Sequence, residues 1–267
     1  MSMSRTSPTC RAPERMEAGA IAAAARGAAG AQAMPAPLVS ARGVTLQYRT
    51  PQHIVTATWR VDFDVLPSDR FILLGPSGCG KSSLLKAVGG FLPPVEGRLT
   101  INGRPIVQPG PDRMMVFQEF EQLLPWKTVL GNVLFPMRAT GRFRGREAME
   151  RAQDMLSGGM KMRVAIARAM AMEPDILLMD EPFAALDALT RRRMQEELLG
   201  LWDQLRFTML FVTHSIEEAI LVGSRILVLS PHPGRVCAEL NAEAFHHGNV
   251  DQDRKSTRLN SSHDSAS

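Results

Sequence analysis

The residues that most clearly indicate chemistry form the segment Gly75-Pro-Ser-Gly-Cys-Gly-Lys-Ser82. Its G-x-x-x-x-G-K-S spacing lets the backbone turn tightly, so that successive N–H groups converge on phosphate oxygens. Lys81 would reach the β- and γ-phosphates of a nucleotide, and the Ser82 hydroxyl would contact Mg²⁺. The predicted nucleotide contacts in this segment are Gly75, Pro76, Ser77, Gly78, Cys79, Gly80, Lys81, Ser82 and Ser83.

The sequence around this segment supports phosphate binding over a simple glycine-rich turn. The apolar run Phe71–Leu74 predicts a strand that enters the loop, and Ser82–Val88 is compatible with a helix that leaves it. A helix that starts there directs the positive end of its dipole at the phosphates. A turn without a ligand would not require Lys and Ser at these positions, so we expect a phosphate loop.

A second predicted strand ends in two carboxylates. The run Asp175–Met179, which is continuously apolar after Asp175, is typical of a strand buried on both faces of a parallel sheet, and Asp180-Glu181 follows it. Asp180 is placed to bind the magnesium shell, and Glu181 to orient or deprotonate the attacking water. Alone, such a pair could equally be a solvated strand end or the first turn of a helix. After a phosphate loop, we interpret it as catalytic.

A second donor-rich segment, Leu156-Ser-Gly-Gly159, precedes a predicted helix over Met160–Ala171. Ser157 at a helix start followed by two glycines can bind an anion, although a well-capped helix explains the same residues. Because one phosphate loop is already present, this second segment suggests a nucleotide shared between two copies of the chain.

These motifs, in this order, resemble the nucleotide-binding subunit of ATP-binding cassette (ABC) transporters, over about Leu38 to Leu240. The resemblance implies that Tyr48 stacks on adenine and that Gln118 contacts magnesium and water. It also implies that Asp187 lies in an interface loop and that His214 contacts the γ-phosphate. Gln118, Glu181 and His214 are thus the expected catalytic residues, and Ser82, Gln118 and Asp180 the expected metal contacts.

The resemblance further implies an ATPase that uses ATP and Mg²⁺ and closes as a dimer, with each copy covering its partner's ATP through Ser157, Gly158 and Gly159. The expected partners are transmembrane permease subunits, a second identical subunit and, indirectly, a periplasmic solute-binding protein. The expected location is the cytoplasmic face of the inner membrane. Leu123–Leu130 and Ser230–Arg235 resemble the nitrate, sulfonate and taurine importer group.

The interval between Gln118 and Ser157 is shorter than in that family, as if one helix and a loop were absent. The helix predicted over Arg144–Met155 runs directly into Ser157. A truncated, non-catalytic ATP-binding fragment is therefore the alternative function. A DNA-repair or chromosome-maintenance ATPase would need a coiled-coil insertion or paired zinc-type cysteines, which the sequence lacks.

The expected fold is α/β, a P-loop NTPase with a mainly parallel sheet. An antiparallel β patch over Leu38–Leu66 and Gly97–Ile106 should flank the sheet, with a hairpin turn at Asn102-Gly103. A shortened helical subdomain over about 119–172, a helix over Leu189–Leu205 and strands at 207–213 and 225–230 complete the domain at 38–240.

The 267-residue chain has a net charge of +4, carried mostly by its ends, which gives no argument for nucleic-acid binding. Three cysteines without metal-ligand spacing fit a reducing compartment. No apolar run reaches the roughly 18 residues that a membrane span needs. We expect residues 1–37 to be a disordered or over-called extension and 241–252 a partial C-terminal segment. Residues 253–267 resemble a translated sequencing adapter.

Overall fold

The computed structural model describes residues 35–49, 51, 53–117, 123–156 and 161–242. All of its helices and strands belong to the unit that begins at Pro37. Gln118, Ser157–Gly159 and the segment 253–267 lie outside the described residues, so the expectations for them remain predictions.

The larger sheet has six strands in the order β10-β9-β3-β8-β7-β6. All neighbours are parallel except β9 and β10, as expected for a mainly parallel sheet. Its central strands are apolar on both faces because helices cover them. The strands are β3 Arg70–Leu74, β6 Arg113–Val116, β7 Ile176–Asp180, β8 Thr208–Thr213, β9 Arg225–Leu229 and β10 Val236–Asn241.

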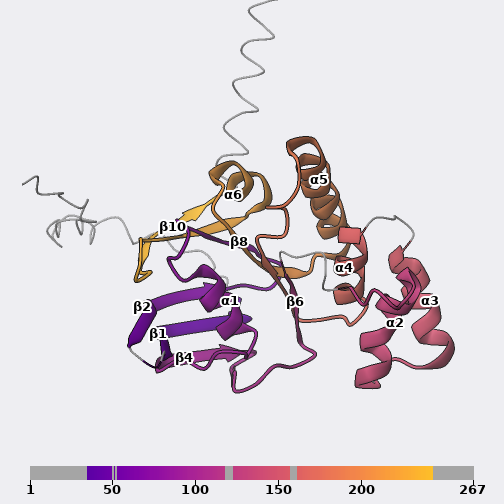
Figure 1. The fold of residues 1–267 in the computed structure, drawn as a ribbon, viewed down its shortest axis with the longest axis horizontal. Coiled ribbons are helices and arrows are strands. Elements are labelled where there is room, and N and C mark those ends of the chain that lie inside the picture. The colour runs from indigo at the N-terminus through magenta and orange to yellow at the C-terminus, as the bar shows by residue number, and fades with distance from the viewer. Residues whose placement is uncertain (1–34, 50, 52, 118–122, 157–160, 243–267) are drawn as a thin grey trace, which may run out of the picture. The chain divides into compact units, whose positions relative to one another are not determined.

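The smaller sheet is antiparallel, in the order β2-β1-β4-β5. It forms from β1 Val39–Arg49, β2 Ile54–Val65, β4 Glu96–Ile101 and β5 Arg104–Pro105. The hairpin predicted at Asn102-Gly103 joins β4 to β5, and both residues have positive φ, 49° and 74°. This is the backbone that Asn-Gly turns favour. The antiparallel patch is therefore confirmed (Figure 1).

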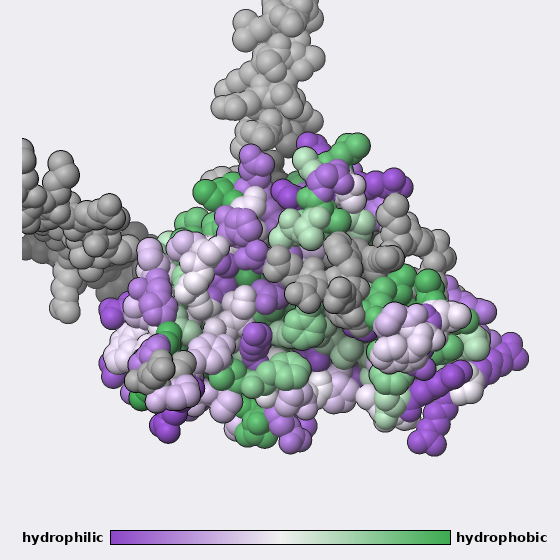
Figure 2. Space-filling model, in the orientation of Figure 1, coloured by the Kyte–Doolittle hydropathy of each residue, from purple (hydrophilic) through white to green (hydrophobic). Residues whose placement is uncertain are grey.

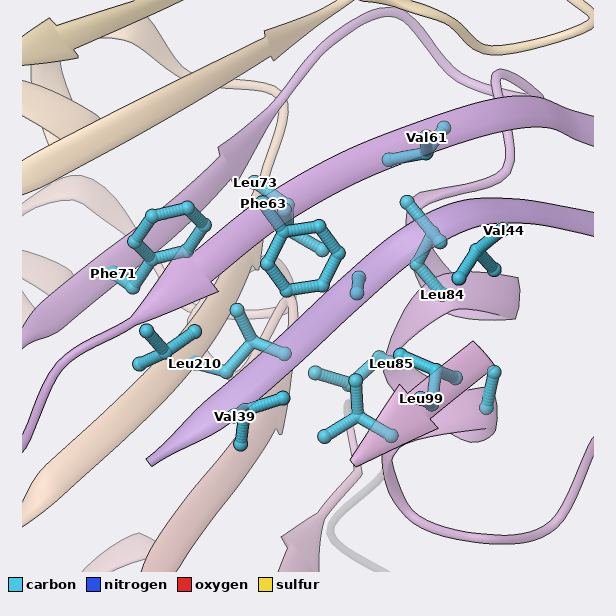
Figure 3. Packing of buried hydrophobic residues seen from close by; sticks show 14 of the residues in the cluster. Val39, Val44, Val61, Phe63, Phe71, Leu73, Leu84, Leu85, Leu99 and Leu210 are labelled. Atoms are coloured by element: carbon cyan, nitrogen blue, oxygen red, sulfur yellow. The ribbon is translucent and has the colours of Figure 1, made fainter. Parts of the chain in front are cut away.

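Helices cover both faces of the parallel sheet. α1 (Lys81–Val88) packs between the two sheets, and its buried residues Leu84 and Leu85 belong to one apolar cluster with Phe71, Leu73 and Leu210 from the parallel sheet (Figure 3). On the opposite face, α5 (Ala188–Leu205) and α6 (Ile216–Val222) cover the alternate strand residues. The strict alternation of side chains along a strand divides the core into these two layers.

Three helices form a lobe next to the edge strand β6: α2 (Val129–Thr140), α3 (Gly145–Leu156) and α4 (Lys161–Met170) (Figure 1). They bury a core of their own, which includes Leu134, Met137, Ala152 and Ala167. The shortened subdomain thus retains a packed interior.

Predicted boundaries for the central elements agree with the structure within about two residues. Four elements of the described chain had no counterpart in the predictions: α2, α6, β6 and β10. Within the residues that the structure describes, no helix is long and apolar enough to span a bilayer.

Candidate nucleotide-binding site

The phosphate loop connects the end of β3 to the start of α1, with Pro76, Ser77 and Gly78 exposed. Gly80 is the N-cap of α1 and has φ 96°, a conformation that favours glycine. A Cβ on Gly80 would lie 2.5 Å from Thr58 Cγ2 and 2.6 Å from the Ala57 carbonyl oxygen. The glycine is therefore required both by its backbone angle and by close packing.

Lys81 lies at the start of α1 and is 5% exposed. Its ammonium group folds over the loop, and Nζ donates to the carbonyl oxygens of Gly75 (2.9 Å) and Pro76 (3.0 Å). An ammonium has three donors, so one remains for a ligand. The lysine charge is thus held directly above the exposed loop.

Ser82 lies in the first turn of α1 and Asp180 at the carboxyl end of β7, and Ser82 Oγ donates to Asp180 Oδ1 over 2.8 Å. These two residues are 98 positions apart in the sequence and were both predicted as metal contacts. Burial raises the pKa of Asp180 above its ordinary value, against the lowering effects of the Ser82 hydroxyl and of Lys86 and Lys81. A partly buried carboxylate beside a hydroxyl is a suitable pair of oxygen ligands for a hard cation.

Glu181 and His214 form the second pair of the site, with His214 Nδ1 3.0 Å from Glu181 Oε2. Glu181 follows β7 and His214 follows the adjacent strand β8, so the two parallel strands bring them together. A cavity of about 60 Å³ adjoins the pair and is also lined by Phe183, Thr213 and Ser215. This volume is sufficient for water molecules next to the carboxylate.

The backbone of Glu181 is in the left-handed region, with φ 45°. Its N–H donates to the Val212 carbonyl oxygen over 3.1 Å, and its own carbonyl accepts from Ala184 N–H over 3.1 Å. Such a conformation is unfavourable for a residue with a side chain and persists where neighbouring contacts determine it. These bonds fix the direction in which the carboxylate leaves the strand.

Tyr48 lies in β1, and its hydroxyl donates to Ser83 Oγ over 3.0 Å. Tyr48 is 38% exposed, so part of its side chain can contact a ligand. The predicted aromatic residue thus reaches the same helix start as Lys81 and Ser82.

Asp187 has a local structural role, and its predicted place at a dimer interface stays a prediction. As the N-cap of α5, its carboxylate accepts the Thr190 N–H over 3.0 Å, which lowers its pKa. Leu189, the second residue of α5, is strongly exposed. The cap orients the start of α5 and leaves this apolar side chain at the surface.

The thiol of Cys79 does not face the open side of the loop. The side chain is fully buried, and a Cβ on Gly75 would lie 2.9 Å from its Sγ. Burial raises the pKa of the thiol, against the lowering effect of Lys81. Cys79 can therefore contact a phosphate only through its backbone.

The predictions did not include three residues that pack against the loop from elsewhere. Ala57 and Thr58 in β2 contact Gly80, and Gly234 contacts Cys79. These contacts join segments far apart in the chain, and no local pattern indicates them.

The family model described as "ABC transporter" matches residues 59–184. The taurine import ATP-binding protein TauB of Rhizobium johnstonii is 49% identical over 205 residues, which are 71% of this chain and 78% of that protein. The nitrate import ATP-binding protein NrtD of Synechococcus elongatus is 40% identical over 210 residues, 72% of this chain and 76% of that protein.

The solved structures that resemble this chain are also ATP-binding cassettes. The dimeric ATP-binding cassette MJ0796 in a post-hydrolysis state with ADP and Pi is 30% identical to this chain. It aligns with a TM-score of 0.64, over 76% of this chain and 98% of that one. The cassette cbiO1 of Clostridium perfringens aligns with a TM-score of 0.68 at 24% identity, over 81% of this chain and 94% of that one, and supports the fold alone.

A phosphate loop with its lysine, a Ser–Asp pair and a Glu–His pair lie together at one edge of the parallel sheet. The curated relatives share at least 40% of residues with the chain over more than two thirds of their own lengths. The chain belongs to the ABC transporter family, as an ATP-binding ATPase subunit.

Proposed function

We propose that the chain binds Mg²⁺-ATP at the loop Gly75–Ser83, with the adenine against Tyr48, and hydrolyses it with Glu181 and His214. The observation that carries this assignment is the convergence of Lys81, Ser82, Asp180 and Glu181 at the carboxyl ends of β3 and β7. Ligands of open α/β sheets bind at this edge.

Ser82 Oγ and Asp180 Oδ1 fit a magnesium ion. No group of three His, Cys, Asp or Glu side chains that could hold a metal occurs among the described residues. Mg²⁺ retains several water and phosphate ligands in such sites, so two protein oxygens are sufficient. When bound, the ion would neutralise charge on the β- and γ-phosphates.

The remaining chemistry depends on positioning. Lys81 and the loop N–H groups would hold the phosphate oxygens, while the Glu181 carboxylate orients the attacking water or accepts its proton. His214, with Nδ1 protonated, would donate to Glu181 and direct its other ring nitrogen at the γ-phosphate. Phosphoryl transfer needs mainly such orientation and charge stabilisation.

Two copies would enclose the nucleotides, with Ser157, Gly158 and Gly159 of each copy over its partner's ATP. The related cassette MJ0796 is a dimer. In this chain, Leu189 and Ile216 expose 82% and 65% of their surface close in sequence to Asp187 and His214. Exposed apolar residues next to a site are typical of a surface that a partner covers.

A permease would dock on the helical lobe, at the cytoplasmic face of the membrane. Trp126 is 75% exposed at the start of this lobe, and Val129 and Phe135 are exposed on α2. Figure 2 shows apolar side chains at the surface over the helices of the lobe. The names of the relatives favour an importer of taurine or nitrate. We include related sulfonates in the proposed solute group, and a periplasmic solute-binding protein would supply the solute.

The test of the ATPase site is phosphate release and ATP binding by the full chain with Mg²⁺. Lys81→Ala should weaken ATP binding, whereas Glu181→Gln should bind ATP normally and lose at least about 100-fold in turnover. Glu217→Gln, an exposed neighbour on α6, is the matched control and should keep full activity. Unchanged turnover in Glu181→Gln would contradict the assigned role.

The solute is tested separately, in the source organism. Deletion of the gene should abolish growth on taurine or another sulfonate as sole sulfur source, or on nitrate as sole nitrogen source. Growth on all of these would exclude the proposed solute group and leave the ATPase assignment unaffected.

A further inference from the structure

The loop Ser230–Arg235 connects β9 to β10 and packs against the phosphate loop. We propose that Gly234 in this loop is a positioning residue for nucleotide binding, which holds the Cys79–Gly80 peptide in the conformation that presents the Gly80 N–H group. The inference rests on the proposed phosphate-binding role of Gly75–Ser82.

Gly234 connects the two sheets at the phosphate loop. Its N–H donates to the Ala57 carbonyl oxygen over 3.0 Å, and its carbonyl accepts the Trp59 N–H over 2.9 Å. These two hydrogen bonds form a parallel β-bridge between Gly234 and Thr58. A residue that follows β9 in the parallel sheet is thus hydrogen-bonded to β2 of the antiparallel sheet.

The phosphate loop lies directly against this bridge. A Cβ on Gly234 would be 2.0 Å from the Cys79 carbonyl oxygen, a distance at which the loop would have to move. On the other side of the bridge, Thr58 Cγ2 and the Ala57 carbonyl oxygen contact the position where Gly80 lacks a side chain. The two glycines therefore let three backbone segments approach closely.

The 230–235 loop is itself held in one conformation. Ser230 N–H donates to the Arg235 carbonyl oxygen over 2.9 Å, and Ser230 Oγ accepts the Arg235 N–H over 3.0 Å. Two prolines, Pro231 and Pro233, restrict its backbone further. Because these hydrogen bonds and prolines hold the 230–235 loop in one conformation, a methyl group added at Gly234 would displace the phosphate loop and not the 230–235 loop.

Displacement of Cys79 would change the site in a specific way. The Cys79 peptide leads directly into Gly80, whose φ of 96° sets the direction of the next N–H groups and of Lys81. A shift of this peptide turns the donors away from the phosphates. The expected defect is in nucleotide affinity, for ADP as well as ATP, because both place phosphates in this loop.

The experiment measures the Kd of ATP and ADP by calorimetry, with the full chain and Gly234→Ala. We expect Kd to rise at least ten-fold for both nucleotides. Gly97→Ala is the matched control, since its Cβ would lie 2.3 Å from the Gly43 carbonyl oxygen, and the nearest atoms that it would meet belong to Arg42 and Gly43 and not to the phosphate loop. Gly97→Ala should lower the melting temperature by about as much as Gly234→Ala does, but leave the Kd of both nucleotides unchanged.

Ser230→Ala is a milder second variant that loosens the loop without a clash. It should raise Kd two- to five-fold and increase the alkylation rate of Cys79, measured in a background where Cys10 and Cys237 are serine. Unchanged Kd in folded Gly234→Ala overturns the inference. If that variant does not fold, unchanged Kd and alkylation rate in Ser230→Ala overturn it.

The two proposals can fail independently. If the unmodified chain binds neither nucleotide, the phosphate-binding assignment itself fails. If the chain binds ATP, Lys81→Ala weakens binding and Gly234→Ala binds normally, then the positioning role alone is wrong.

Discussion

At the scale of single residues, Asp180 is held in an environment that favours its protonated form. Burial raises its pKa, and the neighbouring Glu181 carboxylate acts in the same direction. An isolated carboxylate at this position would destabilise the folded protein at neutral pH. A divalent cation bound at the proposed metal site would remove that unfavourable effect.

We predict that Asp180→Asn stabilises the protein without metal at neutral pH. Because the folded-state pKa is raised, the native state of the unmodified chain binds more protons than the unfolded state in the window above the ordinary Asp value of about 3.9. The free energy of unfolding of the unmodified chain therefore falls as pH rises through that window. In Asp180→Asn this decrease is absent, because the asparagine does not ionise. Urea denaturation of both proteins at several pH values, with EDTA present, measures the difference.

Two outcomes decide this prediction. The advantage of Asp180→Asn should disappear near pH 3, where the carboxyl is protonated in both states. A variant that is less stable than the unmodified chain across the whole range would mean that the Ser82 hydrogen bond outweighs the burial of the charge.

The strained backbone of Glu181 gives a second prediction at this scale. Glu181→Gly should raise the free energy of unfolding by about 1 kcal/mol, because glycine adopts φ 45° without steric cost. Glu181→Gln retains the strain and should leave stability unchanged, and both variants should lose hydrolysis. Thermal denaturation measures this, and equal stability of the two variants would show that the conformation is not strained.

At the scale of elements, Asn132 determines how the helical lobe begins. This residue of α2 is 3% exposed and contacts the chain segment before the helix. Its Oδ1 accepts the Leu124 N–H over 2.7 Å, and its Nδ2 lies within hydrogen-bond distance of the carbonyl oxygens of Leu124, Lys127 and Thr128. The segment that carries the exposed Trp126 is thereby tied to α2.

We predict that Asn132→Ala costs about 2–3 kcal/mol of stability, because several buried backbone groups lose their partner. Arg146→Ala, which removes an exposed ion pair with Glu150 on α3, is the control in the same lobe and should cost less than about 0.5 kcal/mol. Chemical denaturation compares them. Equal losses of stability in the two variants would mean that water molecules take over the hydrogen bonds of the Asn132 side chain.

The sequence predicted the elements with strong local patterns and missed others. The buried strands β7 and β8 and the helix α1 were predicted because their apolar runs are continuous or next to a recognisable loop. The short helix α6 was missed, although Ser215 and Glu218 have the spacing of a capping box and Ser215 Oγ accepts the Glu218 N–H over 3.3 Å. Pro136 inside α2 made that helix hard to recognise.

In the candidate site, too, the sequence predicted the residues that belong to local motifs and missed those brought together by distant parts of the chain. Lys81, Ser82, Asp180 and Glu181 were predictable because each belongs to a motif with local spacing. The packing of Ala57, Thr58 and Gly234 against the loop was not, because it depends on how the two sheets meet.

At the scale of the whole molecule, the fold brings the phosphate loop and both carboxylates to one edge of the parallel sheet. The helical lobe is a separate layer with its own core. Arg151 supports it by contacting Glu173 and donating to the Ala171 carbonyl oxygen over 3.1 Å. These contacts join α3 to the residues that directly follow α4 and so hold the two helices of the lobe together.

The most direct test of the account is the ATP-dependent dimerisation of the full-length Glu181→Gln protein, measured by light scattering on a sizing column. Without hydrolysis, a closed dimer should accumulate. We predict a monomer without nucleotide, a dimer with Mg²⁺-ATP, and no dimer when Ser157→Arg is added. A protein that binds ATP and stays monomeric would contradict the account and support a non-catalytic ATP-binding fragment.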